Sequence, residues 1–177
     1  MKILTETQSR TIIGIVAAIC AFPVMSCSPG AGQTQSQESE EKSNAPLADF
    51  KPCSSLNEQQ KKQLNITTPG ETNELDDQSC DWKANGSDFG ISVYSDKPLK
   101  EIKFSDAEEK NKTEVNNREA LLVKNNTGSG MCSLAFAVTD SSSISVNSMA
   151  DTPGDTETAC DLVKKAAPMV EQNISDS

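Results

Sequence analysis

Apolar and polar residues alternate along much of the chain after residue 78, and this period-two pattern predicts strands. Phe89, Ile91 and Val93 alternate with polar residues, and Asn85-Gly86 before them is the strongest two-residue hairpin signal. The expected strands cover residues 79–84, 88–95, 119–125, 132–138 and the region around 144–146. Successive hairpins of this kind imply an antiparallel sheet of about five strands.

Two segments have helical patterns instead. Asn57 followed by Gln60 resembles a capping box, which predicts a short helix over residues 57–65. Residues 156–174 predict a longer C-terminal helix, and Pro168 should kink this helix or end its first half. Its apolar stripe consists of Cys160, Val163, Ala167, Val170 and Ile174. We therefore expect an α+β fold in which an N-terminal and a C-terminal helix pack on the sheet.

The first 27 residues have the pattern of an export signal with a lipid attachment site. The apolar run at residues 11–25 is too short for a transmembrane helix, which needs ~20 residues. It ends in Val-Met-Ser-Cys at residues 24–27, which resembles the lipobox of the lipoprotein signal peptidase. The rival Cys20 follows Ile19, which is too bulky for the cleavage pocket, and an ordinary secretory peptide is the alternative. We expect lipid, including palmitate, on Cys27 and a domain on the extracytoplasmic side of the cell membrane.

The region after this cysteine differs in composition from the rest of the chain. Residues 28–48 are rich in Ser, Gln, Gly and Glu and contain almost no large apolar residue. Such a segment cannot offset its chain entropy by burial, so we expect a flexible tether. Residues 49–177 then form a single extracytoplasmic domain.

Four cysteines remain in this domain, and an exported protein is expected to oxidise them. They are Cys53, Cys80, Cys132 and Cys160, and they allow three pairings. We favour Cys53–Cys80 and Cys132–Cys160, since each bond would tie a helix to a neighbouring strand. Each would close a loop worth roughly 3–4 kcal/mol on the chain-entropy model. Because the chain has no histidine and no Cys-x-x-Cys spacing, we expect neither zinc nor another cofactor.

Composition excludes several classes of function. The chain has 16 Lys and Arg against 26 Asp and Glu, a net charge of −10, which disfavours nucleic acid and anionic lipid surfaces as partners. The lack of histidine removes Ser-His-Asp triads and Cys-His nucleophiles. We expect the protein to be a monomer.

Clusters of acidic residues and a serine run are the remaining polar groupings. The acids within residues 76–81, and those at Asp151, Asp155 and Glu157, could bind calcium, but neither group has the spacing of an EF-hand. Solvated loops and a helix start explain both groups. The serines at 141–143 have no base to activate them, so we expect a turn there.

The order of the cysteine motifs also carries a family resemblance. The motifs are Pro52-Cys53-Ser54-Ser55-Leu56, Cys80-Asp81-Trp82, the strand headed by Cys132, and Ala159-Cys160-Asp161-Leu162-Val163. In this order, behind a lipobox and a polar tether, they resemble the actinobacterial lipoprotein family called domain of unknown function 3558, over about residues 49–175. Ser55 stands where the family usually has Leu. The resemblance implies the fold, the disulfides and the surface location, but no activity and no site residues.

Three kinds of function remain open. We expect a non-catalytic binding or accessory module for a ligand or protein of the cell envelope. A hydrolase with paired carboxylates, which needs no histidine, is the alternative, and a purely structural envelope protein is a third. The irregular stretch 96–118, with Pro98 and Phe104, is the longest connection, so we expect the binding site where it meets the sheet.

Overall fold

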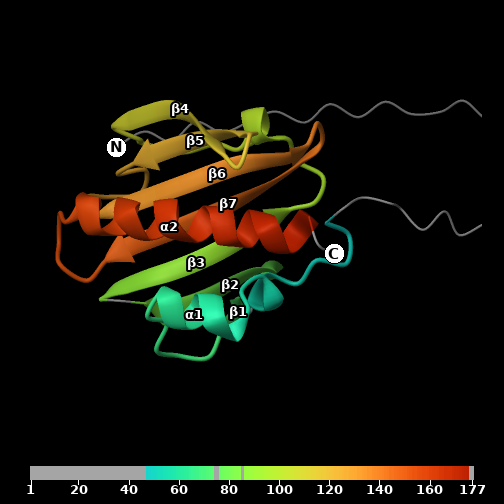
Figure 1. Ribbon diagram of the computed structural model, residues 1–177. Helices are drawn as coiled ribbons and strands as arrows, with labels where there is room; N and C mark the ends of the chain where they lie inside the picture. The colour runs from blue at the N-terminus through green and yellow to red at the C-terminus, as the bar shows by residue number, and fades with distance from the viewer. Residues whose placement is uncertain (1–46, 74–75, 85, 176–177) are drawn as a thin grey trace, which may run out of the picture. The chain divides into compact units, whose positions relative to one another are not determined.

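The computed structural model describes residues 47–73, 76–84 and 86–175. Figure 1 shows one antiparallel sheet of seven strands in the order β1-β2-β3-β7-β6-β5-β4. The strands are β1 (Glu71–Asn73), β2 (Asp76–Ala84), β3 (Ser87–Tyr94), β4 (Glu109–Val115), β5 (Arg118–Lys124), β6 (Met131–Thr139) and β7 (Ser142–Ala150). The sequence therefore predicted the α+β class and the antiparallel sheet correctly, but the strand number of about five was wrong. The two missed strands, β1 and β4, are the edges of the sheet.

The edge strand β4 lies inside the stretch 96–118, for which the sequence predicts an irregular connection. Six of its seven residues are exposed, and Val115 is buried. Without an inward-facing row, the alternation that marks a half-buried strand is absent. Its connection to β5 is a two-residue turn in which Asn116 and Asn117 have φ values of 45° and 71°. Two successive positive φ angles are typical of a type I′ hairpin turn, and Asn tolerates them.

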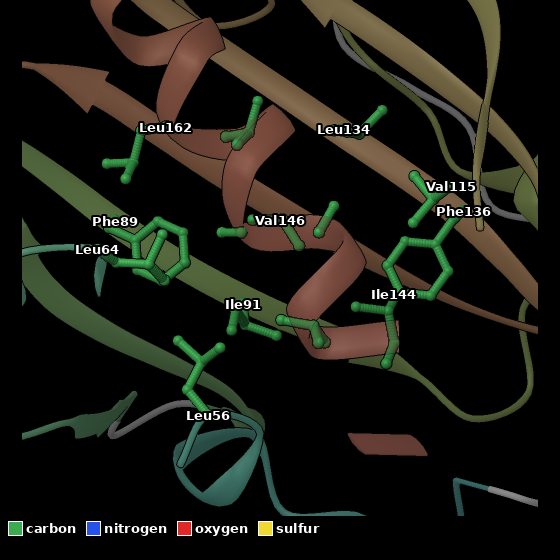
Figure 2. Close-up of a cluster of buried hydrophobic side chains, with 14 of the residues drawn as sticks. Leu56, Leu64, Phe89, Ile91, Val115, Leu134, Phe136, Ile144, Val146 and Leu162 are labelled. Carbon is green, nitrogen blue, oxygen red and sulfur yellow. The ribbon is translucent and has the colours of Figure 1, made fainter. Parts of the chain in front are cut away.

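One long helix, α2 (Thr156–Ser175), covers one face of the sheet over β6 and β7. All five residues of its predicted apolar stripe are buried. Figure 2 shows Leu134, Phe136, Ile144 and Val146 of the sheet at the contact with this helix. The helix is continuous through Pro168, so the expectation that Pro168 ends its first half is wrong. Burial of the stripe on both sides of Pro168 stabilises the helix more than one missing N–H group weakens it.

The expected N-terminal helix on the sheet is not matched. The capping box forms, because Gln60 N donates to Asn57 Oδ1 and Asn57 N donates to Gln60 Oε1, both at 2.9 Å. The helix α1 (Glu58–Gln63) has only six residues, however, and its Gln60 side chain donates to Met169 O of α2 at 3.3 Å. The short 3₁₀ turn η1 (Pro52–Ser54) makes the contacts with β2 and β3 instead.

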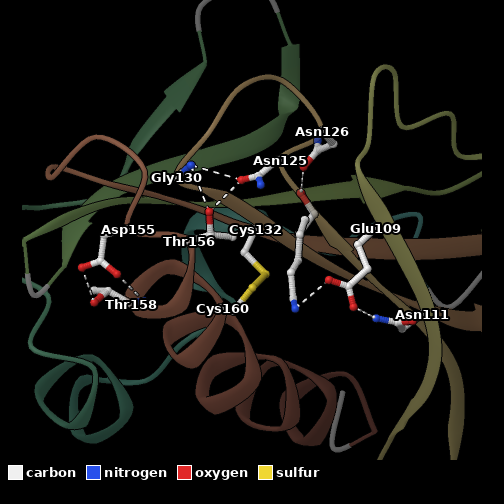
Figure 3. Close-up of a disulfide and its surroundings, with 12 residues drawn as sticks. Glu109, Asn111, Asn125, Asn126, Gly130, Cys132, Asp155, Thr156, Thr158 and Cys160 are labelled. Atoms are coloured by element: carbon white, nitrogen blue, oxygen red, sulfur yellow. Dashed lines mark hydrogen bonds and ion pairs between the residues drawn. A yellow bond between two sulfur atoms is a disulfide. The ribbon is translucent and has the colours of Figure 1, made fainter.

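Two disulfides fasten these helical segments to the sheet, with the pairing favoured from the sequence. Cys53 in η1 is bonded to Cys80 in β2, and Cys132 in β6 is bonded to Cys160 in α2 (Figure 3). The second bond is buried in the core, whereas Cys53 is only partly buried. The Trp82 indole shares a face of the sheet with Cys80, and both side chains approach the same side of Gly70.

A polar clamp joins the β4–β5 hairpin to the C-terminal half of α2. Arg118 Nε donates to Glu171 Oε1 at 2.7 Å, and Arg118 Nη1 donates to Val138 O at 2.8 Å. Asn116 Nδ2 donates to Glu171 Oε2 at 2.9 Å and to Pro168 O at 3.1 Å. The buried carboxylate of Glu171 thus has charged and neutral donors, as burial of a charge requires.

The N-terminal predictions fall mostly outside the described residues. These include Cys27, the signal segment and residues 28–46 of the predicted tether. Leu47 is already buried in the core, with 1% of its surface exposed. Within the described ranges, no helix combines the length and hydrophobicity needed to cross a membrane.

Candidate functional site

The connection between β3 and β4, residues 95–108, crosses the sheet face that α2 does not cover. Residues that pair across strands share a face, and Val123 and Ser143 belong to the face opposite Ile144 and Val146. Both are nevertheless completely buried. The connection is fixed there because Ser143 Oγ donates to Lys97 O at 2.6 Å. The stretch 96–118 therefore does meet the sheet, through this connection and through β4.

Beneath the connection lies a hollow of about 410 Å³, which we call the apolar hollow. This volume is within the range of small-molecule sites, ~300–1,000 Å³. Its apolar lining comes from Pro98, Leu99, Ile102, Ala120, Leu121 and Ala137. Its polar lining comes from Lys100, Lys112, Glu119, Thr139 and Asp140. The short 3₁₀ turn η2 (Leu99–Glu101) forms one wall, and β4, β5 and β6 form the other.

A second hollow of about 630 Å³ adjoins the first, and we call it the lysine hollow. It is lined by Tyr94, Lys97, Lys100, Glu101, Ile102 and Lys103. The Lys97 ammonium lies 5.1 Å from the centre of the Tyr94 ring, within cation–π range. Burial, and secondarily the charge of Asp76, raises the pKa of the Tyr94 phenol, so it stays neutral and able to donate.

Two carboxylates share a third, smaller hollow on the same face of the sheet. Asp81 and Asp88 line it together with Met131, Asn147 and Met149. Burial raises the pKa of Asp81, and the charges of Asp88 and Glu71 raise it further. The neighbouring Asp88 forms an ion pair with Lys83, and Asp88 Oδ1 lies 2.6 Å from Lys83 Nζ. Asp81 as a whole residue is exposed, so this hollow does not enclose a pair of buried carboxyl groups.

The comparisons with known proteins decide the family. The model of a family described as "Protein of unknown function (DUF3558)" matches residues 21–173. The chain belongs to this family. No curated protein and no solved structure matches it. Membership of the DUF3558 family agrees with the resemblance seen in the cysteine motifs, and it assigns no ligand, so the chemistry must come from the site itself.

The calcium candidates in this DUF3558 domain have structural roles where they are described. Asp155 caps α2, because Thr158 N donates to Asp155 Oδ1 at 3.1 Å and Thr158 Oγ1 donates to Asp155 Oδ2 at 2.7 Å (Figure 3). The two bonds from Thr158 lower the pKa of Asp155. Asp76 Oδ1 likewise accepts from Gln78 N at 2.8 Å. Among the described residues, no group of three or more His, Cys, Asp or Glu is arranged to hold a metal ion.

The serine run lies in a different place from the one expected. Only Ser141 is in the turn, while β7 begins at Ser142. Ser143 is buried and holds the connection through Lys97, as described above. The run therefore contributes to the site by positioning its wall.

The predicted stretch 96–118 contains the η2 side of both hollows, but Pro98 is the one lining residue that the sequence singled out, and the lining from β3, β5 and β6 was missed. A signal for some of the lining residues is present, since Lys97, Lys100 and Lys103 recur every third residue in an acidic chain. Leu121 and Ala137 carry no such signal, because alternation in β5 and β6 places them on the face that is solvated in a simple two-layer fold.

Proposed function

We propose that this DUF3558 protein is anchored by lipid at Cys27 on the extracytoplasmic side of the cell membrane and works as a non-catalytic binding module. Its binding site is the apolar hollow beneath the β3–β4 connection. The lipobox-like end of the apolar N-terminal run supports the anchor. The hollow supports the binding role, because it combines an apolar lining with a few charged groups.

The position of the apolar hollow is the observation that carries this proposal. Leu121 and Ala137 are only partly buried, although they lie on the same face of the sheet as Ser143, which the connection covers. Apolar surface left accessible beneath a segment that could have covered it is a usual feature of a ligand site. The wall at η2 and the floor on the sheet are both ordered, so the site is preformed.

The hydrolase alternative rests on Asp81 and Asp88. Asp81 pairs across the strands with Gly90, so Asp88 is its diagonal neighbour. A carboxyl with a raised pKa beside a second carboxyl group is the arrangement of glycoside hydrolases. Because the hollow around them is shallow and Asp81 is exposed, we place this function second. Turnover of an envelope polymer that disappears in Asp81→Asn and Asp88→Asn variants would favour it instead.

The binding site can be tested by filling the hollow. The full chain is extracted from its own envelope membranes in a neutral detergent, and retained non-protein mass is measured by native mass spectrometry. We expect Ala137→Phe to lose this mass, since the ring would occupy the hollow, while thermal unfolding shows an intact fold. Ala48→Phe, at an exposed position, is the matched control and should retain it. Retention by Ala137→Phe, or a wild-type chain with no bound mass, would contradict the proposal.

A further inference from the structure

The lysine hollow concentrates positive charge in a strongly acidic protein. Lys97, Lys100 and Lys103 line it against one acidic residue, Glu101, whereas the chain as a whole carries −10. None of the three lysines forms an ion pair with another residue in the described part of the chain, where the basic partners are Lys61, Lys83, Arg118 and Lys124. Ammonium groups gathered in a concave site without carboxylate partners favour an anion.

The two hollows are parts of one continuous surface. Lys100 and Ile102, which flank Glu101 in the sequence, line both hollows. A molecule that contacts the ammonium groups can therefore extend directly over Ile102 onto Leu121 and Ala137. The basic part and the apolar part are thus placed as the head and the chain of an amphiphile require.

We propose that the two hollows together bind a single-chain anionic amphiphile, with its head among Lys97, Lys100 and Lys103 and its aliphatic chain in the apolar hollow. This inference rests on the proposed function and names the class of its ligand. Phosphate and carboxylate heads both accept hydrogen bonds from ammonium groups. Tyr94, whose side chain carries a hydroxyl donor, lines the same hollow.

The acidic residues of the apolar hollow set the orientation of the ligand. Glu119 and Asp140 line the apolar hollow but not the lysine hollow. Lys112 also lines the apolar hollow, so away from the shared Lys100 this hollow has two acidic residues against one lysine. This excess of negative charge disfavours a second anionic group there, so a ligand with one charged end is favoured over a dianion with charges at both ends. An uncharged chain meets no such repulsion.

The full chain is reconstituted in phosphatidylcholine nanodiscs and exposed to a photoactivatable lysophosphatidylglycerol. A lysophosphatidylcholine with the same photoactivatable chain serves as the zwitterionic comparison. Cross-linked peptides are mapped by mass spectrometry. We expect saturable labelling of peptides covering residues 97–103 and 119–123, with the anionic probe labelling at about tenfold lower concentration.

The head assignment is tested by a triple variant with Lys97, Lys100 and Lys103 each replaced by Gln. We expect it to lose the preference for the anionic probe while the chain still labels residues 119–123. The matched control replaces three exposed lysines elsewhere, Lys51, Lys62 and Lys164, by Gln, and changes the net charge equally. An equal loss of preference in the control would overturn the head assignment.

Two further outcomes separate this inference from the proposed function. Equal labelling of the hollow by both probes would overturn the anionic class but would leave a binding site there. Labelling by neither probe, together with native mass that Ala137→Phe still displaces, would show a different ligand class in the same site.

Discussion

Removal of the buried disulfide should destabilise the domain more than removal of the other one. The Cys132–Cys160 bond closes a separation of 28 residues and the Cys53–Cys80 bond closes 27. On the chain-entropy model each contributes ~3.6 kcal/mol, so this contribution is the same for both. With ~2.1 cal/mol/K of unfolding entropy per residue over 47–175, that corresponds to a Tm decrease of about 13 °C.

Burial makes the difference between the two bonds. Cys132 and Cys160 are 0% and 2% exposed and lie at the contact between β6 and α2. The other bond joins Cys80, which is 0% exposed, to Cys53, which is partly exposed. Replacing both buried cysteines by Ala removes packed sulfur atoms and leaves a cavity, which adds ~1–2 kcal/mol. We therefore expect ~5 kcal/mol for the Cys132→Ala, Cys160→Ala variant, in which two buried sulfur atoms are lost. We expect ~4 kcal/mol for the Cys53→Ala, Cys80→Ala variant, in which only the sulfur of Cys80 is completely buried.

Denaturant unfolding followed by far-UV circular dichroism measures both values without relying on Trp82, which lies beside Cys80. Mild reductant should likewise open the Cys53–Cys80 bond first, as thiol mapping would show. Equal losses in the two variants, or a larger loss at Cys53–Cys80, would refute the argument that burial adds to the entropic contribution.

Three further predictions concern single positions. Glu171→Ala should cost about 3–4 kcal/mol, because it leaves Arg118 without its buried partner; a double-mutant cycle with Arg118→Met measures the coupling, and an additive cycle would contradict the clamp. The pKa of Asp155 lies below its ordinary 3.8 in the folded state, so its contribution is present above that pH and is lost as pH falls through the folded pKa. Asp155→Asn should therefore flatten the acid limb of the stability profile, and an unchanged profile would refute this. Cys27→Ala should move the protein from the membrane to the soluble fraction, and a membrane-bound variant without acyl mass on the wild type would refute the anchor.

The central sheet, α2 and both disulfides could be predicted because the buried residues of a helix or strand recur in the sequence with the repeat of that element. The stripe of α2 and the alternating residues of β3 and β6 all face the core, so each has the period of its element. The edge strand β4 has no buried face, since Val115 alone is buried, and the sequence signal for the hairpin is limited to the turn at Asn116 and Asn117. At Pro168 the local sequence predicts a helix end, but tertiary packing of α2 on the sheet outweighs the effect of the proline, and the helix continues.

The candidate site was predictable in place but not in composition. A long connection between strands indicates where a sheet face can be covered, and the structure puts both hollows along residues 95–108. Leu121 and Ala137 line the apolar hollow only because the β3–β4 connection crosses their face of the sheet. That choice follows from tertiary contacts such as Ser143 Oγ to Lys97 O, which join residues distant in sequence.

Hydrogen exchange on the full chain can locate bound material beneath the β3–β4 connection. The protein is measured as extracted from its own membranes and again after its bound material has been removed. We expect the bound form to be protected in peptides covering residues 95–103 and 119–123, with little change elsewhere in the sheet. Protection centred instead on Asp81 and Asp88, or no difference between the two forms, would contradict a binding site beneath the β3–β4 connection.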